Sequence, residues 1–228
     1  INLDLKSNFK VHIPMEVIYN PIRTLKSKPD HNDRNDSSEP FRIISVGRLI
    51  PVKNQQSLIR SLTFLNDNVS LEIYGVGPLK ESLESLIQEL NLQDRVHLKG
   101  STVTINEAIL NSHCLVLNSL SEGFPNVILE AMSLGVPVIA TNCMSGPLEL
   151  LNDNETVQIE NGGFTRAKYG LMVNVDDDNG LAEAIKHFQD NESDRVHYGT
   201  SSFERSKEFD ISRIGLQVKA LIDRLCVA

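Results

Sequence analysis

Residues 41–54 read FRIISVGRLIPVKN and predict a buried strand that ends in a tight turn. The apolar run 41–46 stops at Gly47, and glycine lets the backbone turn sharply at the end of a strand. Residues 55–65 follow with apolar side chains at helical spacing. A strand, a tight turn and a helix together form the repeating unit of a parallel sheet.

The same alternation of strand and helix continues as far as residue 190. We predict further strands at 69–74, 96–99, 114–117, 138–140 and 170–175, and further helices at 79–90, 105–111, 126–134, from 147 and at 180–188. Because such units cross over with one hand, the alternation predicts a parallel sheet with helices on both faces. The expected fold class is therefore α/β, a Rossmann-like doubly wound parallel sheet of about six strands. By analogy with such folds, we expect the strand order 3-2-1-4-5-6.

The chain outside this sheet divides into two parts. Residues 1–40 end in a polar stretch, from Pro21 to Pro40, that is typical of a solvated linker. Residues 191–228 are predicted to form C-terminal helices with an apolar side. The expected division of the chain is therefore 1–40, 41–190 and 191–228.

The composition is that of a globular protein and argues against two classes of function. The 228 residues are 40% hydrophobic and 23% charged, which is enough for a full core. The formal net charge of -8 speaks against nucleic acid as a partner, because nucleic-acid binders neutralise many phosphates. No apolar stretch is long enough to span a bilayer. Three cysteines without a Cys-x-x-Cys motif favour the reducing cytoplasm.

Two loops carry the residues that suggest a chemistry. In the expected strand order, the loops at 47–54 and 118–126 face each other where ligands enter such a sheet. The first loop carries Arg48 and Lys53 close to the start of a helix. Two cations and free amides at a helix N-terminus would form a pocket for a diphosphate. Ordinary surface charges are the alternative interpretation of these two residues.

The second loop opens a helix that carries an acidic residue on its apolar side. Gly123 lets the backbone approach a ligand, and Pro125 suits the start of a helix. Glu130 shares a helical face with apolar residues, so its carboxylate is expected to point inward. An inward carboxylate needs hydrogen-bond donors, because an unpaired buried charge is costly. Sugar hydroxyls would supply them, and an internal ion pair with a lysine or arginine is the alternative.

The segment EGFPNVILE, residues 122–130, resembles the signature of the retaining glycosyltransferases of family 4, also called group 1. Further matches follow in the family's order: VGRL at 46–49 with Lys53, YGVGPL at 74–79, VHLKG at 96–100, GVPVIAT at 135–141 and SGPLE at 145–149. Together they cover residues 41–190. The chain therefore resembles the C-terminal, donor-binding half of a GT-B enzyme, in which two Rossmann-like domains face each other across a cleft.

The resemblance implies a role for each matching residue. Catalytic roles fall on Arg48 and Lys53, which would hold the donor diphosphate and stabilise its developing charge, and on Glu122, which would contact the transferred sugar. Glu130 would accept hydrogen bonds from the ribose. The implied donor-binding residues are Gly47, Arg48, Lys53, Lys99, Gly100, Ser101, Glu122, Gly123, Phe124, Asn126, Val127, Ile128 and Glu130.

Within that set, main-chain contacts account for most of the remaining roles. The resemblance places the turn 99–101 at the nucleobase, the amides of Gly123, Phe124 and Asn126 along the sugar, and those of Val127 and Ile128 near the phosphates. No metal and no cofactor are expected, since the nucleotide sugar is a substrate. The acidic run 176–178 is interpreted as a helix cap rather than as a metal site.

The activity that the resemblance implies is transfer of a glycosyl group from a nucleotide sugar, by preference a UDP-sugar, to an acceptor hydroxyl with retention. Surface polysaccharide or glycan synthesis is the expected setting. The acceptor, a glycan or lipid-linked glycan, would bind through an N-terminal domain that this chain lacks, and residues 1–22 resemble the stretch that joins the two domains. The alternative is a nucleotide-binding regulatory or interaction module of the same fold without catalysis.

Two further expectations follow from the absence of that domain. The chain begins at Ile1, from which we expect it to be part of a longer protein and to be inactive alone. We expect it in the cytoplasm, at most peripheral to the inner face of the membrane. Contact with the membrane would be made only by the absent half, because 1–228 contains no basic amphipathic helix.

Overall fold

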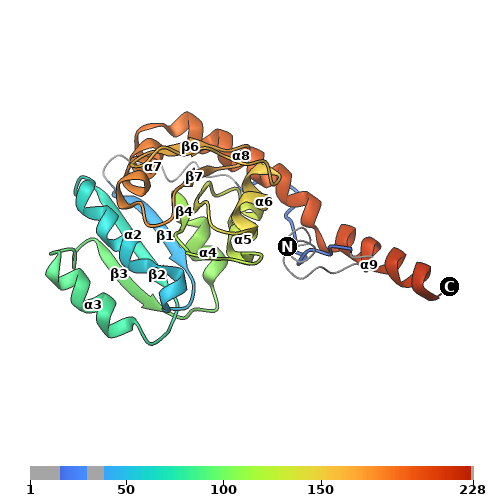
Figure 1. The fold of residues 1–228 in the computed structure, drawn as a ribbon, viewed down its shortest axis with the longest axis horizontal. Helices are drawn as coiled ribbons and strands as arrows, with labels where there is room; N and C mark the ends of the chain where they lie inside the picture. The colour runs from blue at the N-terminus through green and yellow to red at the C-terminus, as the bar shows by residue number, and fades with distance from the viewer. Residues whose placement is uncertain (1–15, 30–38, 227–228) are drawn as a thin grey trace.

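Seven strands form one sheet in the order β3-β2-β1-β4-β5-β7-β6 (Figure 1). Their bounds are β1 Phe41–Val46, β2 Val69–Tyr74, β3 Val96–Gly100, β4 Cys114–Leu117, β5 Val138–Thr141, β6 Phe164–Arg166 and β7 Leu171–Val173. The structure is a computed structural model that describes residues 16–29 and 39–226. All neighbouring strands pair in parallel except β6 and β7, which are antiparallel.

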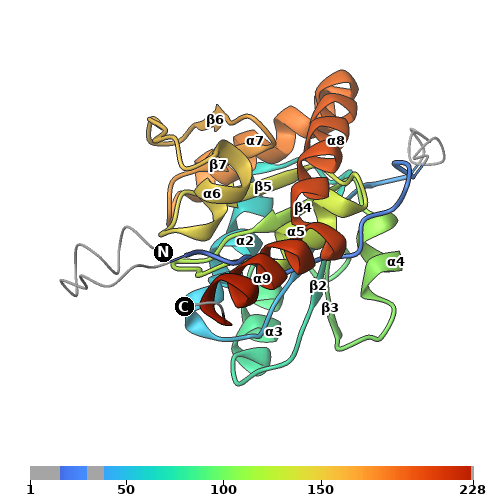
Figure 2. The same ribbon diagram turned by 90° about the vertical axis from the view of Figure 1, so that its right-hand side faces the viewer.

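Helices cover both faces of the sheet (Figures 1 and 2). They are α2 Gln55–Ser61, α3 Lys80–Glu89, α4 Ile105–Leu110, α5 Asn126–Ser133, α6 Gly146–Asn152, α7 Asp178–Asp190, α8 Glu192–Ser206 and α9 Ile211–Cys226, with short 3-10 turns η2 Pro51–Lys53, η3 Leu62–Phe64 and η4 Lys207–Phe209. Buried side chains of α2, α3 and α7 share one core cluster, and those of α4, α5 and α6 share a second on the other face. The layers are therefore helix, sheet, helix.

The strands β4, β5 and β7 are apolar at nearly every position and fully buried because both of their faces are covered. Neighbouring residues point to opposite sides, so Ile43 joins the first core cluster and Ile44 joins the second. The expected strand order and fold class are confirmed, with β1 beside β4 at the point where the order reverses. The edge strand β6 was not predicted, because its three half-buried or exposed residues carry no apolar alternation.

The C-terminal helices attach to the sheet through α8. Gly199 allows this packing, since a Cβ at that position would lie 2.5 Å from the carbonyl oxygen of Gly135. The helix α9 extends away from the sheet (Figure 1), and its side chains are exposed apart from Ile214 and half-buried Val218 and Leu221. No helix within residues 16–29 and 39–226 combines the length and the hydrophobicity needed to cross a membrane.

The segment before the sheet is attached where α8 gives way to α9 (Figure 2). The Ile22 amide donates to the Phe209 carbonyl oxygen at 2.9 Å, and the Ile211 amide donates to the Ile22 carbonyl oxygen at 2.8 Å. Thr24 donates to the Asp210 carboxylate through both its amide and its hydroxyl. The beginning of the expected linker is thus bound to the body of the molecule, while 1–15 and 30–38 lie outside the described residues.

Candidate functional site

The loops that follow β1 and β4 are in direct contact, as the sequence predicts. The Leu120 amide donates to the Val52 carbonyl oxygen at 2.8 Å. The Asn118 side-chain amide donates to the Asn54 carbonyl oxygen at 3.0 Å. Since β1 and β4 are the central strands, this contact lies at the switch point of the sheet, where doubly wound folds bind ligands.

A lysine and a carboxylate from these loops form an ion pair at this point. The Lys53 ammonium binds Oε1 of Glu122, and the Ser119 hydroxyl donates to the same oxygen at 2.6 Å. The two side chains are only 21% and 11% exposed. The lysine stem lies over Gly47, where a Cβ would be 3.5 Å from Lys53 Cδ. Lys53 therefore has a fixed, largely buried position, unlike an ordinary surface charge, whereas Arg48 on the same loop is exposed.

The loop 122–126 is held on one side by the backbone before α6. The Glu122 amide donates to the Met144 carbonyl oxygen at 2.9 Å, and the Ser145 amide donates to the Glu122 carbonyl oxygen at 2.8 Å. A Cβ on Gly146 would lie 2.2 Å from the Gly123 carbonyl oxygen, so only glycine allows this approach. Gly123 itself has open space where its side chain would be. Its main chain is thus accessible to a ligand.

Glu130 lies one turn into α5 and lines a hollow of about 360 Å³. The hollow is lined by Pro21, Ile22, Arg23, Leu25, Asn106, Asn126, Leu129, Glu130, Ser133 and Leu134. Burial raises the pKa of the Glu130 carboxyl above its usual value. Within 16–29 and 39–226, its carboxylate makes no hydrogen bond or ion pair with another side chain. The internal ion pair that was the alternative from sequence is therefore not found among these residues.

The turn after β3 is separated from the β1 loop by the loop after β2, which contacts both. The Gly75 amide donates to the Gly100 carbonyl oxygen at 2.8 Å, and a Cβ on Gly75 would lie 1.9 Å from the Gly47 carbonyl oxygen. Gly100 has a left-handed φ of 70°. Lys99 is already paired with Glu72, at 3.2 Å, and Ser101 is exposed. The turn therefore offers a ligand its main chain and a serine hydroxyl more readily than the lysine.

The first turn of α5 carries the rest of the predicted residues. The Ile128 amide donates to the Pro125 carbonyl oxygen at 3.0 Å, so this amide is engaged within the turn. The Ile128 side chain is buried in the core. Asn126 is exposed, and Phe124 and Val127 are half-buried. The predicted residues from the β1 and β4 loops thus meet, and Ile128 contributes to the packing beneath them.

Sequence reasoning missed several residues that hold this arrangement. Ser119 and Asn118 follow β4 directly and could have been found from their position at the end of a strand. Tyr19 and Asn20 contact the loop 122–126 from about a hundred residues away, and no spacing in the sequence indicates that contact.

The acidic run before α7 is occupied by protein donors. The Asp177 carboxylate accepts from the Gly180 amide at 2.8 Å, which caps α7 as predicted, and from the Gly162 amide at 2.7 Å. Asp176 accepts from Asn54 at 2.8 Å, and Asp178 accepts from Ser57. In the part of the chain that the structure describes, no group of His, Cys, Asp or Glu side chains is arranged to hold a metal ion.

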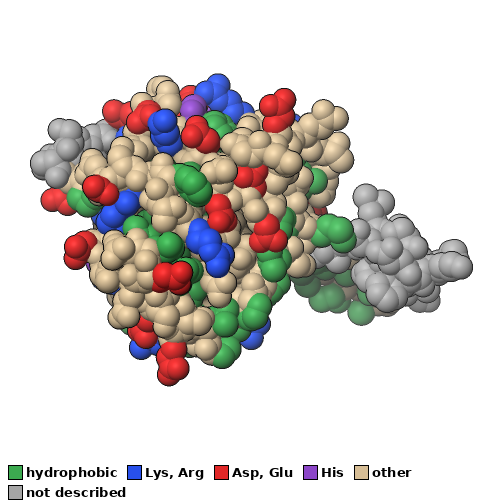
Figure 3. Space-filling model, turned by 60° about the vertical axis from the view of Figure 1, so that its left-hand side comes forward, with side chains coloured by type: hydrophobic (Ala, Val, Ile, Leu, Met, Phe, Trp, Pro, Cys, Tyr) green, Lys and Arg blue, Asp and Glu red, His purple; other side chains and the backbone are tan. Residues whose placement is uncertain are grey.

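On one face of the molecule, positive charge is local rather than spread over the surface. On the face drawn in Figure 3, Lys and Arg side chains lie among Asp and Glu side chains without a broad patch of either sign. The chain has a formal net charge of -8, so an anion would meet a favourable potential only near groups such as Lys53 and Arg48.

Comparison with known proteins identifies the family. The sequence profile of the glycosyl transferases group 1 matches residues 27–205. The chain belongs to this family. The chain is 32% identical to an uncharacterized glycosyltransferase, MJ1059, of Methanocaldococcus jannaschii, over 96% of its own length and 58% of that protein. It spans little more than half the length of such curated relatives.

Two more similar proteins have a named activity or a bound ligand. An N-acetylgalactosaminyltransferase of Campylobacter jejuni that acts on a diphospho-undecaprenol-linked saccharide is 31% identical over 92% of this chain and 54% of its own. HepE of Anabaena, solved in complex with UDP, superposes with a TM-score of 0.77 at 23% identity, over 92% of this chain and 57% of its own. The likeness to HepE concerns the fold, which is that of GT-B glycosyltransferases, as expected from the sequence.

Proposed function

We propose that this chain holds the nucleotide-sugar donor of a retaining glycosyltransferase. The observation that carries the proposal is the meeting of Lys53, Glu122 and Ser119 at the switch point of the sheet. A cation for a diphosphate and a carboxylate for sugar hydroxyls lie within one hydrogen bond of each other. That spacing suits a ligand in which a sugar is joined directly to a diphosphate.

The diphosphate lies between the two cations and the start of α5 in this proposal. Lys53 and Arg48 contribute charge, and the Val127 amide contributes a donor at the positive end of the helix. The bond between the anomeric carbon and the diphosphate breaks, the acceptor hydroxyl oxygen forms the new bond to that carbon, and the hydroxyl proton passes to the departing diphosphate. These cations then stabilise the charge that the diphosphate gains, which is electrostatic catalysis without a metal ion.

In this proposal the two glutamates bind the sugar and the nucleoside of the donor. Glu122 accepts hydrogen bonds from hydroxyls of the transferred sugar, whose other side lies along the open main chain of Gly123. Glu130 accepts from the ribose hydroxyls, which supply the donors that its half-buried carboxylate lacks. The base meets the main chain of Gly100, next to Ser101.

The donor is a UDP-sugar and the product belongs to a surface polysaccharide or glycan. Support comes from relatives: HepE was solved with UDP, and the Campylobacter enzyme acts on a lipid-linked saccharide. We place the acceptor, and any contact with the inner face of the membrane, in the part of the longer relatives that this chain does not match. The chain alone binds the donor and transfers nothing, and retention rests on the sequence resemblance.

Calorimetric titration of UDP and GDP into the chain tests the proposal. We expect UDP to bind, with or without EDTA, and Lys53→Ala to weaken binding about 10- to 100-fold, since a hydrogen bond to a charged group contributes about 1.5–3 kcal/mol. Glu130→Ala should also weaken it, whereas Lys80→Ala, at an exposed lysine on α3, should not. If neither diphosphate binds the wild type, the proposal is wrong.

A further inference from the structure

The loop 122–126, here called the sugar loop, is held by two side chains from far earlier in the sequence. The Asn20 side-chain amide donates to Asn126 Oδ1 at 2.8 Å. The ring of Tyr19 packs on the ring of Phe124, with 5.4 Å between their centroids. Adjacent residues of the N-terminal segment therefore fasten the sugar loop on both sides of Pro125.

Tyr19 is itself fixed in place. Its hydroxyl donates to the carboxylate of Glu149 on α6, which is only 8% exposed. Its ring stands edge-on to Phe209, at 5.3 Å. Burial and the neighbouring Glu149 raise the pKa of the Tyr19 hydroxyl to about 12, so it remains a donor at any working pH. Tyr19 thus links α6, η4 and the sugar loop.

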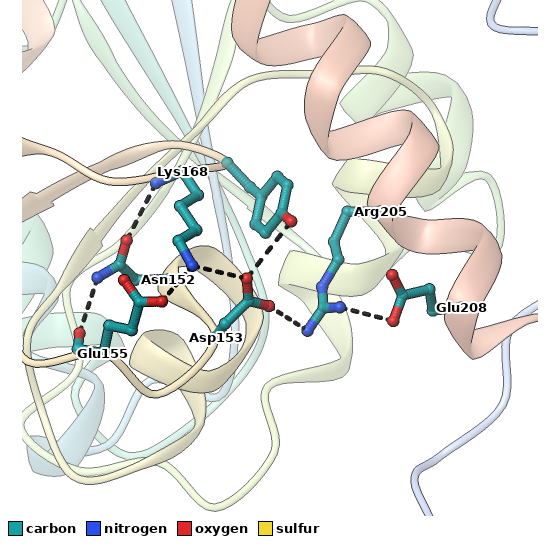
Figure 4. Close-up of polar contacts among 7 residues, drawn as sticks. Asn152, Asp153, Glu155, Lys168, Arg205 and Glu208 are labelled. Atoms are coloured by element: carbon teal, nitrogen blue, oxygen red, sulfur yellow. Dashed lines mark hydrogen bonds and ion pairs between the residues drawn. The ribbon is translucent and has the colours of Figure 1, made fainter.

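The support beneath Tyr19 is cross-linked by charges. Arg205 of α8 binds Asp153 at the end of α6, at 2.7 Å (Figure 4). The Arg205 guanidinium also lies over the Phe209 ring, at 5.3 Å from its centroid. Lys168 binds the same Asp153 at 3.2 Å (Figure 4). Because the ends of α6 and α8 are joined in this way, Phe209 and Glu149 form a firm base for the tyrosine.

We propose that Tyr19 and Asn20 are positioning residues for the transferred sugar. This rests on the proposed function, in which Glu122 and Gly123 of the same loop contact that sugar. The first half of the loop is held by backbone bonds to 144–146, and the second half by Tyr19 and Asn20. When the second half moves, the groups that face the sugar move with it, and small displacements of such groups are costly.

The nucleotide part of the donor has different supports, and this separates the two proposals. Lys53 and Arg48 stand on the β1 loop, and Glu130 stands inside α5, so none of them belongs to the sugar loop. Lys53 contacts that loop at Glu122, in the half that the backbone bonds to 144–146 hold. Loosening the loop is therefore expected to weaken binding of the sugar while leaving binding of UDP unchanged.

The test compares UDP with UDP-glucose, UDP-galactose and UDP-N-acetylglucosamine by calorimetry. The proteins are the wild type, Tyr19→Phe, Asn20→Ala and the control Lys26→Ala, an exposed residue of the same segment. For the sugar nucleotide that binds best, we expect Tyr19→Phe and Asn20→Ala to lower affinity about tenfold. UDP affinity should stay at the wild-type value. Equal losses for UDP and the sugar nucleotide, or no loss, would overturn the proposal.

Hydrogen exchange in the ligand-free chain tests the same idea without any nucleotide. We expect the amides of the sugar loop, 122–126, to exchange faster in Tyr19→Phe and Asn20→Ala than in the wild type. Those of β1 and β4, and all amides of Lys26→Ala, should be unchanged. Unaltered exchange in the sugar loop would contradict the positioning role, whereas failure of UDP to bind the wild type would count against the proposed function alone.

Discussion

Glu130 shows how one half-buried carboxylate can lower the stability of the folded chain. Its carboxylate is half-buried, and burial disfavours the ionised form, which is why its pKa is raised. A raised pKa means that the folded chain holds this proton more tightly than the unfolded chain does. As the pH rises from the pKa of Glu130 in the unfolded chain to its higher pKa in the folded chain, the unfolded chain loses the proton first, and the free energy of unfolding falls.

We therefore expect Glu130→Gln to be more stable than the wild type at pH 7 and to bind UDP more weakly. The gain in melting temperature should disappear when the pH is lowered below the usual pKa of a glutamate, because both proteins then carry a neutral group. Thermal unfolding between pH 4 and pH 8 measures it. Glu183→Gln, at an exposed position on α7, is the control. A wild type more stable than Glu130→Gln at pH 7 would contradict this account.

At this scale the sequence predicted residue identities better than contacts. Gly47 and Lys53 could be singled out because turn chemistry and helix starts have local signatures, whereas Glu122 was singled out by the family resemblance; the topology brings their loops together. The position of Ser119 at the end of a strand could be inferred from sequence, but its hydrogen bond to Glu122 could not. The engagement of the Ile128 amide by Pro125 depends on the exact backbone of one turn, which composition and spacing do not determine.

Two glycines show how differently one residue type acts in neighbouring helices. Gly199 in α8 faces the backbone, with the Gly135 carbonyl oxygen 2.5 Å from a would-be Cβ. Gly215 in α9 has nothing within 4 Å. The backbone cannot yield as a flexible side chain would, so steric repulsion outweighs the better helix propensity of alanine at 199 but not at 215.

We expect Gly199→Ala to lower the free energy of unfolding by about 1–3 kcal/mol. Gly215→Ala, its matched control, should leave it unchanged or raise it by up to about 1 kcal/mol. Urea denaturation measures both. Equal effects of the two substitutions would show that α8 does not pack as described.

Among the elements, those with an apolar pattern were predicted whatever their length, including the short strand β7, whereas β6 was not. The helices α3, α5 and α7 and the central strands follow from apolar periodicity, because their burial repeats the pattern. The strand β6 forms because β7 offers it an edge, and nothing in its own three residues specifies it. The predicted C-terminal helix is broken at η4, where Phe209 turns into the core.

At the scale of the whole molecule, Asp210 joins the two ends of the described chain. It accepts from the amide and hydroxyl of Thr24, and from the Ser212 amide in the first turn of α9. These bonds lower the pKa of Asp210 from 3.8 to about 2. A lowered pKa in the folded chain contributes stability above the unfolded value, and that contribution is lost as pH falls from about 4 to about 2.

We expect Asp210→Ala to lower the free energy of unfolding at pH 7 by about 1–2 kcal/mol, the usual effect of losing a helix cap. The difference from the wild type should shrink as the pH is lowered from 5 to 3. Urea denaturation at several pH values measures it, with Asp223→Ala, at an exposed aspartate of α9, as control. A difference that grows on acidification would refute the assignment.

The arrangement of the elements could be predicted from sequence only where it depends on residues that are close together in the chain. The alternation of strands and helices predicted parallel neighbours joined by crossovers of one hand, each of them a local event, whereas the strand order was expected only by analogy with doubly wound folds. The contacts of Tyr19 with Glu149 and of Thr24 with Asp210 join residues 130 and 186 positions apart. Their side chains are common polar types, so many other pairings would satisfy the same hydrogen-bonding needs, and only the folded chain selects among them.

The close approach at Gly75 limits how this scaffold could be redesigned. The strand ends at Gly47 and Gly75 touch through backbone, and Gly77 is equally crowded, with a would-be Cβ 2.3 Å from the Leu49 carbonyl oxygen. In a mutant library that randomised positions 75 and 77, most variants would misfold. Position 123 opens onto free space, so variation there offers a protein engineer the better starting point for a changed substrate range.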